Sequence, residues 1–584
     1  MELRPLSLAL IAFPRGPACL ATAGVLAVLL VCGALAPTVV DAAPKLREPS
    51  SEVKPPRGFD RTSREVKRIA ARAEKVRAEA AGHHGYQPTA YTRGPGTWQV
   101  SYFDGDSEVV QVRIDDATGA ILEQWSGHHV AWTMARGYEG AFGRKFNSPW
   151  LLIPLGLLFL APFVDPRRPL RIVHLDLLML LGFGVGHVFF NRGEIGLSTP
   201  LAYPVLVYLL GRLLWLGARP RAGPQRLLPL VPVGWLIVAL GFLAAFRVGL
   251  NLIDSNVIDV GYASVIGADR IGAGEGLYGA GFSPDVERGD TYGPFTYLSY
   301  IPFEQVLPWD GGWDGLHAAH AAAITFDLLT LAGLVLLGRR LRPGVAGTEL
   351  GVALGYAWAT YPYALFALTS NANDALVALL CVVALLALTL VPARPGASAA
   401  ARAVALGLGA AAKFAPLALA PLFATGKGGD GRRRQAAVFV AVLAAMLAAA
   451  FLPFIPDGGV RELYDRSVGY QAARRSPFSI WGLVESLRPL QSAVKAAAAV
   501  LALAVAFVPR RRDAFQVAAL GAAVLVAVQL TTTYWFYLYV VWFAPFALIG
   551  MLGPLRGSAG PEPSRADVDE HAGSRAARES VIVA

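Results

Sequence analysis

Residues 315–337 read GLHAAHAAAITFDLLTLAGLVLL. The only ionisable side chains in this stretch are His317, His320 and Asp327, and Arg339 and Arg340 follow it directly. About 20 consecutive apolar residues are enough for a helix to cross the hydrocarbon core of a bilayer. The stretch therefore predicts a membrane-spanning helix that ends in a basic loop.

The composition of the whole chain extends this prediction. Of 584 residues, 54% are apolar and 16% are charged, whereas soluble domains have about 45–50% and about 25%. The mean hydropathy of +0.46 excludes a disordered or collagen-like chain, and it argues against a soluble enzyme. We predict an all-α multispan membrane domain over 149–553. Its eleven expected spans are 149–164, 170–190, 199–216, 227–248, 315–337, 350–368, 374–391, 434–453, 492–508, 514–530 and 534–552.

A twelfth apolar segment, 402–424, has a different pattern. Lys413 interrupts it, and Pro416 and Pro421 follow within one and two helical turns. Proline breaks a helix, so two half-helices that form a re-entrant hairpin fit the segment better than one span. A lysine is costly inside lipid, so Lys413 is expected either to face a polar cavity or to snorkel to the cytoplasmic side. Arg247, near the end of another span, is expected at the membrane interface.

The charges of the loops predict the orientation. Six alternate loops, the first at 165–171 and the last at 509–513, hold 18 Lys and Arg against three acids. The opposite loops hold 8 basic and 15 acidic residues, most of them in 249–314 and 454–491. Basic loops stay in the cytoplasm, so both long loops are expected outside. The net charge of +10 then belongs to cytoplasmic loops and does not indicate a nucleic-acid partner.

The two ends of the chain have simpler patterns. An apolar run over about 18–40 follows Arg4 and Arg15. It is long for a secretory signal, so 1–43 is expected to be an uncleaved signal anchor, with cleavage near Val40-Asp41-Ala42 as the alternative. The tail 554–584 is rich in small and charged residues and is expected to be a disordered cytoplasmic segment.

Residues 44–148 predict a small extracytoplasmic α+β module. Thr62 and Glu65 have the spacing of a capping box in front of a helix expected over 63–81. Strand-like runs follow, separated by turn residues, at Thr97–Phe103, Glu108–Ile114 and Ala120–Trp125. The hairpin pattern over 111–123 resembles a PepSY-type module. The histidine pairs 83–84 and 128–129 are interpreted as solvated loop residues, because no carboxylate or second histidine stands at metal-ligand spacing.

The acidic outer loop 249–314 contains the strongest functional pattern. Three elements follow one another: Asp259-Val260-Gly261-Tyr262, Gly274-Glu275-Gly276-Leu277-Tyr278 and Tyr292-Gly293-Pro294-Phe295. A carboxylate just beyond a helix end, at a membrane surface, can act as general base for a hydroxyl group.

This order resembles the first outer loop of polyprenyl-phosphate-sugar-dependent glycosyltransferases with the GT-C fold, in particular the family 87 alpha-mannosyltransferases. The resemblance implies that Asp259 is the catalytic base, with Asp254 and Asp269 as alternatives. It also draws Tyr262 and Tyr292 into substrate binding.

Further matches to this family follow in the same order over about 400 residues. They are 371–376 (NANDAL), 411–416 (AAKFAP), 475–481 (RSPFSIW) and 534–539 (YWFYLY). The chain departs from the family at 531–533, where three threonines replace a histidine that related chains often carry. A role for a histidine in the last helix is therefore not expected.

The resemblance implies further site residues. A polyprenyl phosphate leaving group requires cations, and arginine forks bind phosphate oxygens well, which makes Arg474 and Arg475 candidates. The same two arginines also fit an ordinary outer-loop surface. His317 and His320, one turn apart, are expected either to line the same pocket or to be simple interfacial histidines.

The resemblance therefore predicts an enzyme that moves a hexose, most often mannose in this family. The donor is a polyprenyl-phosphate sugar, and the acceptor is a glycolipid or glycan outside the cell. No metal or other cofactor is required, and the remaining partners are membrane lipids. A transporter or flippase of lipid-linked saccharides is the alternative, but its polar groups would gather near the bilayer midplane rather than in outer loops.

The loop charges predict that 44–148 and 249–314 lie on the same side of the membrane. Cysteines introduced by Ser107→Cys and Ser283→Cys should both react with a membrane-impermeant maleimide applied to intact cells. Labelling of only one of them would contradict this topology.

Overall fold

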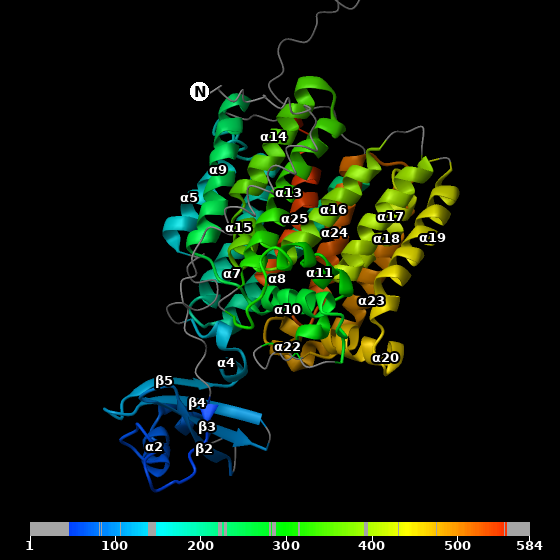
Figure 1. The fold of residues 1–584 in the computed structure, drawn as a ribbon. Helices are drawn as coiled ribbons and strands as arrows, with labels where there is room; N and C mark the ends of the chain where they lie inside the picture. Colours follow the sequence, from blue (N-terminus) through cyan, green and yellow to red (C-terminus); the bar gives the residue numbers. More distant parts are fainter. Residues whose placement is uncertain are drawn as a thin grey trace, which may run out of the picture.

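The computed structural model describes residues 46–556 with short gaps. The gaps are 81, 83–84, 106, 138–147, 220–224, 227–230, 280–281, 283–285, 287, 314–315, 391–394, 430, 475 and 554. The predicted signal anchor and nearly all of the predicted tail lie outside the described residues. A bundle of long helices stands beside a small sheet domain, so the mostly helical fold with a small α+β module is confirmed (Figure 1).

The small module is an antiparallel sheet with two helices. The strands pair in chain order, β1-β2-β3-β4-β5. They are β1 (Leu46–Arg47), β2 (Gln87–Arg93), β3 (Thr97–Asp104), β4 (Ser107–Asp115) and β5 (Ile121–Ser126). The predicted capping box is confirmed, since the Thr62 and Glu65 side chains each bond the backbone N–H of the other residue.

The predicted helix over 63–81 is two helices, α2 (Ser63–Ala70) and α3 (Glu74–Glu79). Extended backbone at Ala73 (ψ 140°) separates them, and this turn lets both Ala73 and Val76 reach the module's core.

Two of the five strands were not predicted from the sequence. Pro88 near the start of β2 argues against a strand, because proline has no N–H for the ladder. In the structure β1 pairs only with Thr92 and Arg93, so the Pro88 end of β2 has no strand partner on that side among the described residues. At that position the missing N–H of Pro88 removes no hydrogen bond of the ladder with β1, and the strand forms.

The membrane domain contains fourteen described helices of eight or more residues besides α10, which lies outside the bundle. They are α5 (Pro149–Leu160), α6 (Ile172–Leu181), α7 (Phe183–Phe190), α8 (Ile195–Ala218), α9 (Val233–Ile253), α13 (His317–Leu341), α14 (Gly344–Thr360), α15 (Pro362–Thr369), α16 (Asp374–Leu388), α17 (Pro395–Ala412), α19 (Arg432–Phe451), α23 (Arg488–Ala504), α24 (Ala514–Thr531) and α25 (Val540–Leu552). Protein covers 89% of the apolar window of α24 but 11% of that of α19. The core therefore surrounds α24, and α19 lies at the edge.

Among the described residues, seven helices are long and apolar enough to cross a membrane, by length and composition. They correspond to seven of the eleven predicted spans. Three others, at 149–160, 374–388 and 537–552, form shorter apolar helices. The span predicted at 350–368 is divided, because Pro362 forces extended backbone on Tyr361 (ψ 118°) and separates α14 from α15.

The segment predicted as two half-helices has unequal arms. Its first arm is the whole of α17, which begins at Pro395 rather than 402. The chain then returns through a short 3₁₀ turn and α18 (Ala420–Thr425). Gly426 at the end of this return lies against the Arg402 side chain, back near the start of α17. The turn between the arms places Lys413 at the opposite end.

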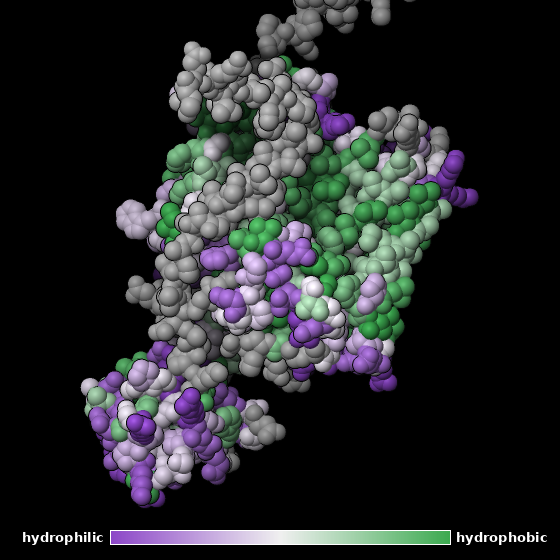
Figure 2. Space-filling view, in the orientation of Figure 1, coloured by the Kyte–Doolittle hydropathy of each residue, from purple (hydrophilic) through white to green (hydrophobic). Residues whose placement is uncertain are grey.

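The surface of the bundle is apolar along the flank formed by α17 and α19, whereas the small module is largely hydrophilic (Figure 2). The prediction that Arg247 lies at the interface is wrong. Its side chain is buried and pairs with Asp327 of α13, with Nη2 and Oδ1 2.5 Å apart. The indole N–H of Trp358 also donates to that carboxylate. A buried charge needs such partners, which the one-dimensional pattern could not supply.

The short helices of the two long loops gather at one end of the bundle, and the small module lies at the same end (Figure 1). These helices are α10 (Asp259–Gly272), α11 (Pro294–Leu298), α12 (Ile301–Glu304), α20 (Gly459–Tyr464), α21 (Tyr470–Ala473) and α22 (Ile480–Leu483). The end of the bundle that carries α10 is named the loop end.

The segments β6 (Gln225–Arg226) and β7 (Leu555–Arg556) pair in parallel.

Candidate functional site

Asp259 is the first residue of α10, at the loop end of the bundle. Ile258 before it is extended, and one carboxylate oxygen of Asp259 accepts a bond from the N–H of Val260 at 2.9 Å. The following residues, from Gly261 to Ala268, are buried, whereas the Asp259 side chain is exposed. The buried residues therefore anchor the helix, and the Asp259 carboxylate at its start points into accessible space.

The approach to α10 is held by the loop between α15 and α16. The N–H groups of Asn256 and Ile258 donate to the carbonyls of Thr369 and Ser370. A Cβ on Gly261 would overlap the carbonyl oxygen of Asn371. The glycine of the Asp-Val-Gly-Tyr element is thus required by a close backbone approach, and this approach determines where Asp259 stands.

His320 belongs to the network behind this loop. Its Nδ1 lies 3.0 Å from Oδ1 of Asn251 and 3.3 Å from Oγ of Ser255. Asn251 in turn donates to Asn371 at 2.8 Å. The structure places His320, together with His317 one turn before it, at the start of α13. The contacts of His320 with Asn251 and Ser255 therefore support the loop.

Lys413 forms a buried ion pair at the loop end. Its ammonium lies 2.7 Å from Oδ1 of Asp374, the first residue of α16, and the Trp542 indole N–H donates to the same oxygen at 2.7 Å. Lys413 was expected either to face a polar cavity or to snorkel to the cytoplasmic side. In the structure its ammonium faces the Asp374 carboxylate. The pair joins the end of α17 to the starts of α16 and α25.

Arg474 lies in an aromatic setting next to this pair. Its guanidinium carbon is 4.3 Å from the ring centre of Tyr534 and 4.9 Å from that of Trp132. Among the described residues, its guanidinium forms no ion pair and donates no hydrogen bond. Arg474 is therefore a cation with rings for neighbours and unused N–H donors.

The pKa of Asp259 links these groups into one site. Burial by the surrounding protein raises this pKa above its ordinary value, even though a water molecule can reach the side chain. The N–H of Val260 and the nearby charges of Arg474 and Lys413 oppose the shift, and Asp374 adds to it. Desolvation disfavours the charged form of a carboxyl group, which is the largest cause of this raised pKa. Asp259, Asp374, Lys413 and Arg474 together are named the charged cluster.

The two predicted tyrosines have different positions. The Tyr292 ring centre is 5.6 Å from the Lys413 ammonium, so Tyr292 borders the charged cluster. The Tyr262 ring packs instead against Trp313, with ring centres 4.5 Å apart, and against Trp309. Tyr262 thus contributes to the hydrophobic packing that holds α10.

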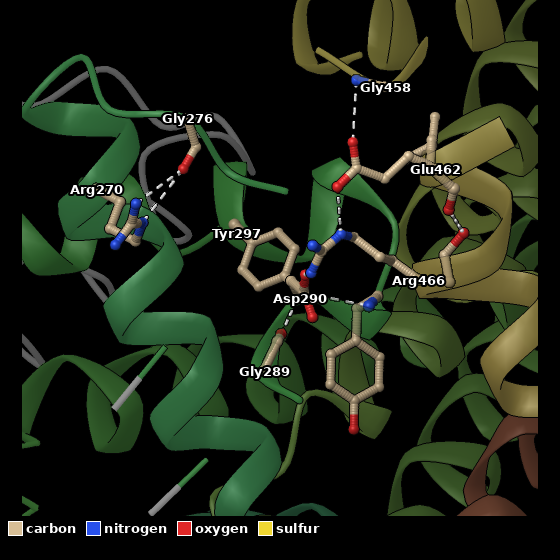
Figure 3. A network of polar contacts seen from close by, with 11 residues as sticks. Arg270, Gly276, Gly289, Asp290, Tyr297, Gly458, Glu462 and Arg466 are labelled. Atoms are coloured by element: carbon tan, nitrogen blue, oxygen red, sulfur yellow. Dashed lines mark hydrogen bonds and ion pairs between the residues drawn. The ribbon is translucent and has the colours of Figure 1, made fainter. Parts of the chain in front are cut away.

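The two long loops are tied together beside the site. Arg466 of the second loop donates to Asp290 of the first loop at 2.9 Å and to Glu462 at 2.8 Å (Figure 3). Tyr297 donates to the carbonyl of Gly289 and closes the same turn (Figure 3). Tyr292 comes shortly after Asp290 in the chain, and the 470–474 segment comes shortly after Arg466. The ion pair between Asp290 and Arg466 therefore keeps Tyr292 and this segment near each other.

Reasoning from the sequence brought Asp259, Tyr292 and Arg474 to one place but missed several neighbours. Asp374 and Tyr534 were noted only as parts of motifs, and Trp132 was assigned to the small module. A signal for Asp374 existed, because a lysine in an apolar segment requires a carboxylate nearby. Arg475 lies outside the described residues.

The charged cluster can bind an anion and accept a proton. Arg474 offers free donors, Lys413 adds positive potential, and Asp259 is a carboxylate without an ion pair in the described part of the chain. No group of three or more His, Cys, Asp or Glu side chains that could hold a metal is found among the described residues. The arrangement suits acid–base chemistry on a phosphate-bearing or otherwise anionic ligand.

The fold and the charged cluster define a polytopic helical protein with an ionisable site at one end. No protein-family model matches the chain, and no curated protein matches it in sequence. The crystal structure of ArnT from Cupriavidus metallidurans bound to undecaprenyl phosphate is similar to it, with 16% sequence identity and a TM-score of 0.36. The similarity covers 55% of this chain and 60% of ArnT, less than two thirds of that structure's length. A likeness of this size does not establish an activity.

The buried pair should be essential for stability. Lys413→Gln leaves the Asp374 carboxylate buried without its cation, which costs about 3–5 kcal/mol when a buried pair is broken. We expect a clear fall in the thermal unfolding temperature of the purified protein. Adding Asp374→Asn should recover most of the loss. Lys495→Gln, on an exposed position of α23, serves as the control, and equal stability of all four proteins would contradict the role of the pair.

Proposed function

We propose that this protein is a membrane glycosyltransferase that uses a polyprenyl-phosphate sugar as donor. The observation that carries the proposal is the exposed Asp259 carboxylate with a raised pKa, close to the unpaired Arg474 guanidinium. One group can take a proton from an acceptor hydroxyl, and the other can bind the phosphate that leaves. The sequence resemblance to family 87 enzymes favours a hexose, and among hexoses mannose.

Asp259 is the general base in this scheme. It removes the proton from a hydroxyl group of the acceptor, whose oxygen then attacks the anomeric carbon of the donor sugar. The bond between that carbon and the phosphate oxygen breaks, and its electron pair stays with the polyprenyl phosphate. The attack comes from the face opposite the leaving group and inverts the configuration. A raised pKa suits this role, because a stronger base takes the proton more readily.

Arg474 and Lys413 stabilise the charge that develops on the leaving phosphate. Preorganised cations in a poorly hydrated site are the usual means of stabilising such a charge. Lys413 is already neutralised in part by Asp374, whereas Arg474 has no carboxylate partner in the described residues. Arg474 is therefore the stronger phosphate ligand of the two, and its planar fork matches the phosphate oxygens.

An apolar cavity next to Lys413 suits the lipid part of such a donor. It has a volume of about 330 Å³ and lies between the end of α17 and the last turns of α19, with Phe414, Phe451 and Leu463 among its lining residues. Because α19 is at the edge of the bundle, the cavity lies on the side where lipid would be. Each buried CH₂ of a polyprenyl chain contributes about 0.8 kcal/mol.

A transporter would require its charges at the middle of the bundle. Two ion pairs lie within the helices, Arg247 with Asp327 and Arg212 with Asp176. The cations of these two pairs already have a carboxylate partner and are not free for a passing substrate. The unpaired Arg474 and the exposed Asp259 lie at the loop end, which favours chemistry there. The loop charges predict that this end lies outside the cell, which supports a glycolipid or glycan of the cell envelope as the acceptor.

Asp259→Asn should abolish sugar transfer and leave the fold intact. The amide keeps the shape of the side chain but cannot accept the proton, and losing a general base costs about 10²–10⁴ in rate. The measurement is transfer of radiolabelled sugar from a polyprenyl-phosphate donor by the purified protein. Asp254→Asn, one helix end earlier, is the matched control and should be much milder.

Two results would contradict this assignment. If Asp259→Asn kept most of its activity while Asp269→Asn lost it, the base would be misplaced. If the wild-type protein turned over no such donor but moved a saccharide lipid across liposome membranes, the transporter would replace the enzyme.

The activity should fall in acid at a pH set by Asp259. Only the carboxylate form is a base, and the pKa is above its ordinary value, so kcat/KM decreases as the pH falls through that raised pKa. Arg474→Gln removes a charge that lowers this pKa and should move the acid limb of the kcat/KM profile to higher pH. Asp374→Asn removes a charge that raises it and should move the limb to lower pH.

Arg461→Gln is the control for these shifts, because the Arg461 side chain is 93% exposed. Its acid limb should coincide with that of the wild type. Acid limbs at one pH in all four proteins would show that Asp259 is not the group that titrates.

A further inference from the structure

The last turns before the membrane domain belong to the bundle rather than to the small module. The short helix α4 (His128–Ala131) follows β5, and a 3₁₀ turn (Thr133–Ala135) follows it. Ala135 is fully buried within the core of the membrane domain, and Trp132 packs against the same core. The core of the module itself contains neither residue. Trp132 and Ala135, which fall within the predicted module range 44–148, thus pack with the core of the membrane domain.

Backbone contacts fix this segment onto the loop end. Nε2 of His129 lies 2.6 Å from the carbonyl oxygen of Gly193, in the turn between α7 and α8. A Cβ on Gly137 would lie 2.5 Å from the N of Gly193, so these two segments of the chain touch through their backbones. Arg136 holds the segment in shape, since its Nε donates to the carbonyl of His129 at 2.8 Å.

Trp132 reaches from this segment into the charged cluster. Its ring packs edge-on against Phe478 at 5.1 Å and lies 5.6 Å from the ring of Tyr534. Phe478 and Tyr534 also pack against each other. The guanidinium of Arg474 lies over both the Trp132 and the Tyr534 rings. The ring of Tyr470 lies near the same guanidinium, at 5.9 Å, so three rings surround one cation.

We propose that Trp132, in the segment that connects the N-terminal module to the bundle, is a positioning residue that holds Arg474 ready to bind the phosphate of a polyprenyl phosphate. The inference deepens the proposed function and rests on it for the identity of the ligand. The connecting segment then contributes one wall of the binding site for the donor.

The physical reason lies in the geometry of an arginine on aromatic rings. The flat guanidinium is attracted to ring faces, and this contact uses none of its N–H donors. The long side chain would otherwise sample many conformations. The rings restrict it, while its donors stay available because no group in the described protein accepts from them. A ligand phosphate then binds an arginine side chain that is already ordered, so binding loses less side-chain conformational entropy.

The test measures binding and does not depend on turnover. The probe is an undecaprenyl phosphate titrated into the purified full-length protein in lipid nanodiscs. Trp132→Ala should weaken binding about fivefold to tenfold, the size expected for losing a partly desolvated cation–π contact. Trp132→Phe keeps a ring over Arg474 and should restore most of the affinity. Trp150→Ala is the control, because Trp150 is 88% exposed on α5, and it should bind as the wild type does.

A double variant distinguishes positioning from a general structural role. If Trp132 acts through Arg474, Trp132→Ala adds no further loss to a protein that already carries Arg474→Ala. Equal binding by Trp132→Ala and the wild type would overturn the proposal, as would fully additive losses in the double variant. A wild-type protein that binds no polyprenyl phosphate overturns it as well.

The two proposals fail separately in these measurements. If the protein binds the lipid phosphate in a Trp132-dependent way but never transfers a sugar, the inference stands and the proposed enzyme activity falls. If it transfers sugar and Trp132→Ala changes neither affinity nor KM for the donor, the activity stands and the inference falls.

Discussion

A charged lysine inside an apolar bundle must have a counter-ion, and the loop end of this protein is built around that constraint. Desolvating an ammonium group is expensive unless a carboxylate and further hydrogen bonds compensate it. Lys413 meets Asp374 and lies over the rings of Tyr292, Tyr539 and Trp542. Because these partners come from α16, α25 and the first long loop, the pair determines how those elements are placed around α17.

Lys413 and Arg474 are two cations at the loop end that the protein holds in different ways. Lys413 is buried and paired with Asp374, so it holds the neighbouring helices together. Only the part of its positive potential that Asp374 does not cancel can act on a ligand. The arginine is held by ring faces and keeps its donors, so a ligand can use them. Asp259 is the matching acid: it is accessible, unpaired within the described residues and raised in pKa by the protein around it. A site that paired all its charges internally would bind nothing.

Much of the fold follows from local patterns in the sequence. The apolar stretches gave the positions of the long helices, because a helix that crosses lipid needs about 20 apolar residues wherever it occurs. The capping box at Thr62 and Glu65 gave the start of α2. Divided and paired elements were harder to predict. The break at Tyr361-Pro362 and the strand β2 both depend on proline. Pro362 interrupts a helix, whereas Pro88 lies at the end of β2 that β1 does not pair with.

The sequence by itself determined that the chain is a mostly helical membrane protein with a small α+β module, and it proposed the two long loops and Asp259 as the candidate site. These follow from composition, from spacing along the chain and from a resemblance carried by short motifs. Only the tertiary structure decided which charges are already neutralised. Arg247 and Asp327, or Lys413 and Asp374, are far apart in the chain but in contact in space. The same holds for Trp132 beside Arg474. Pairing energy depends on distance through space, about which the order of residues along the chain is silent.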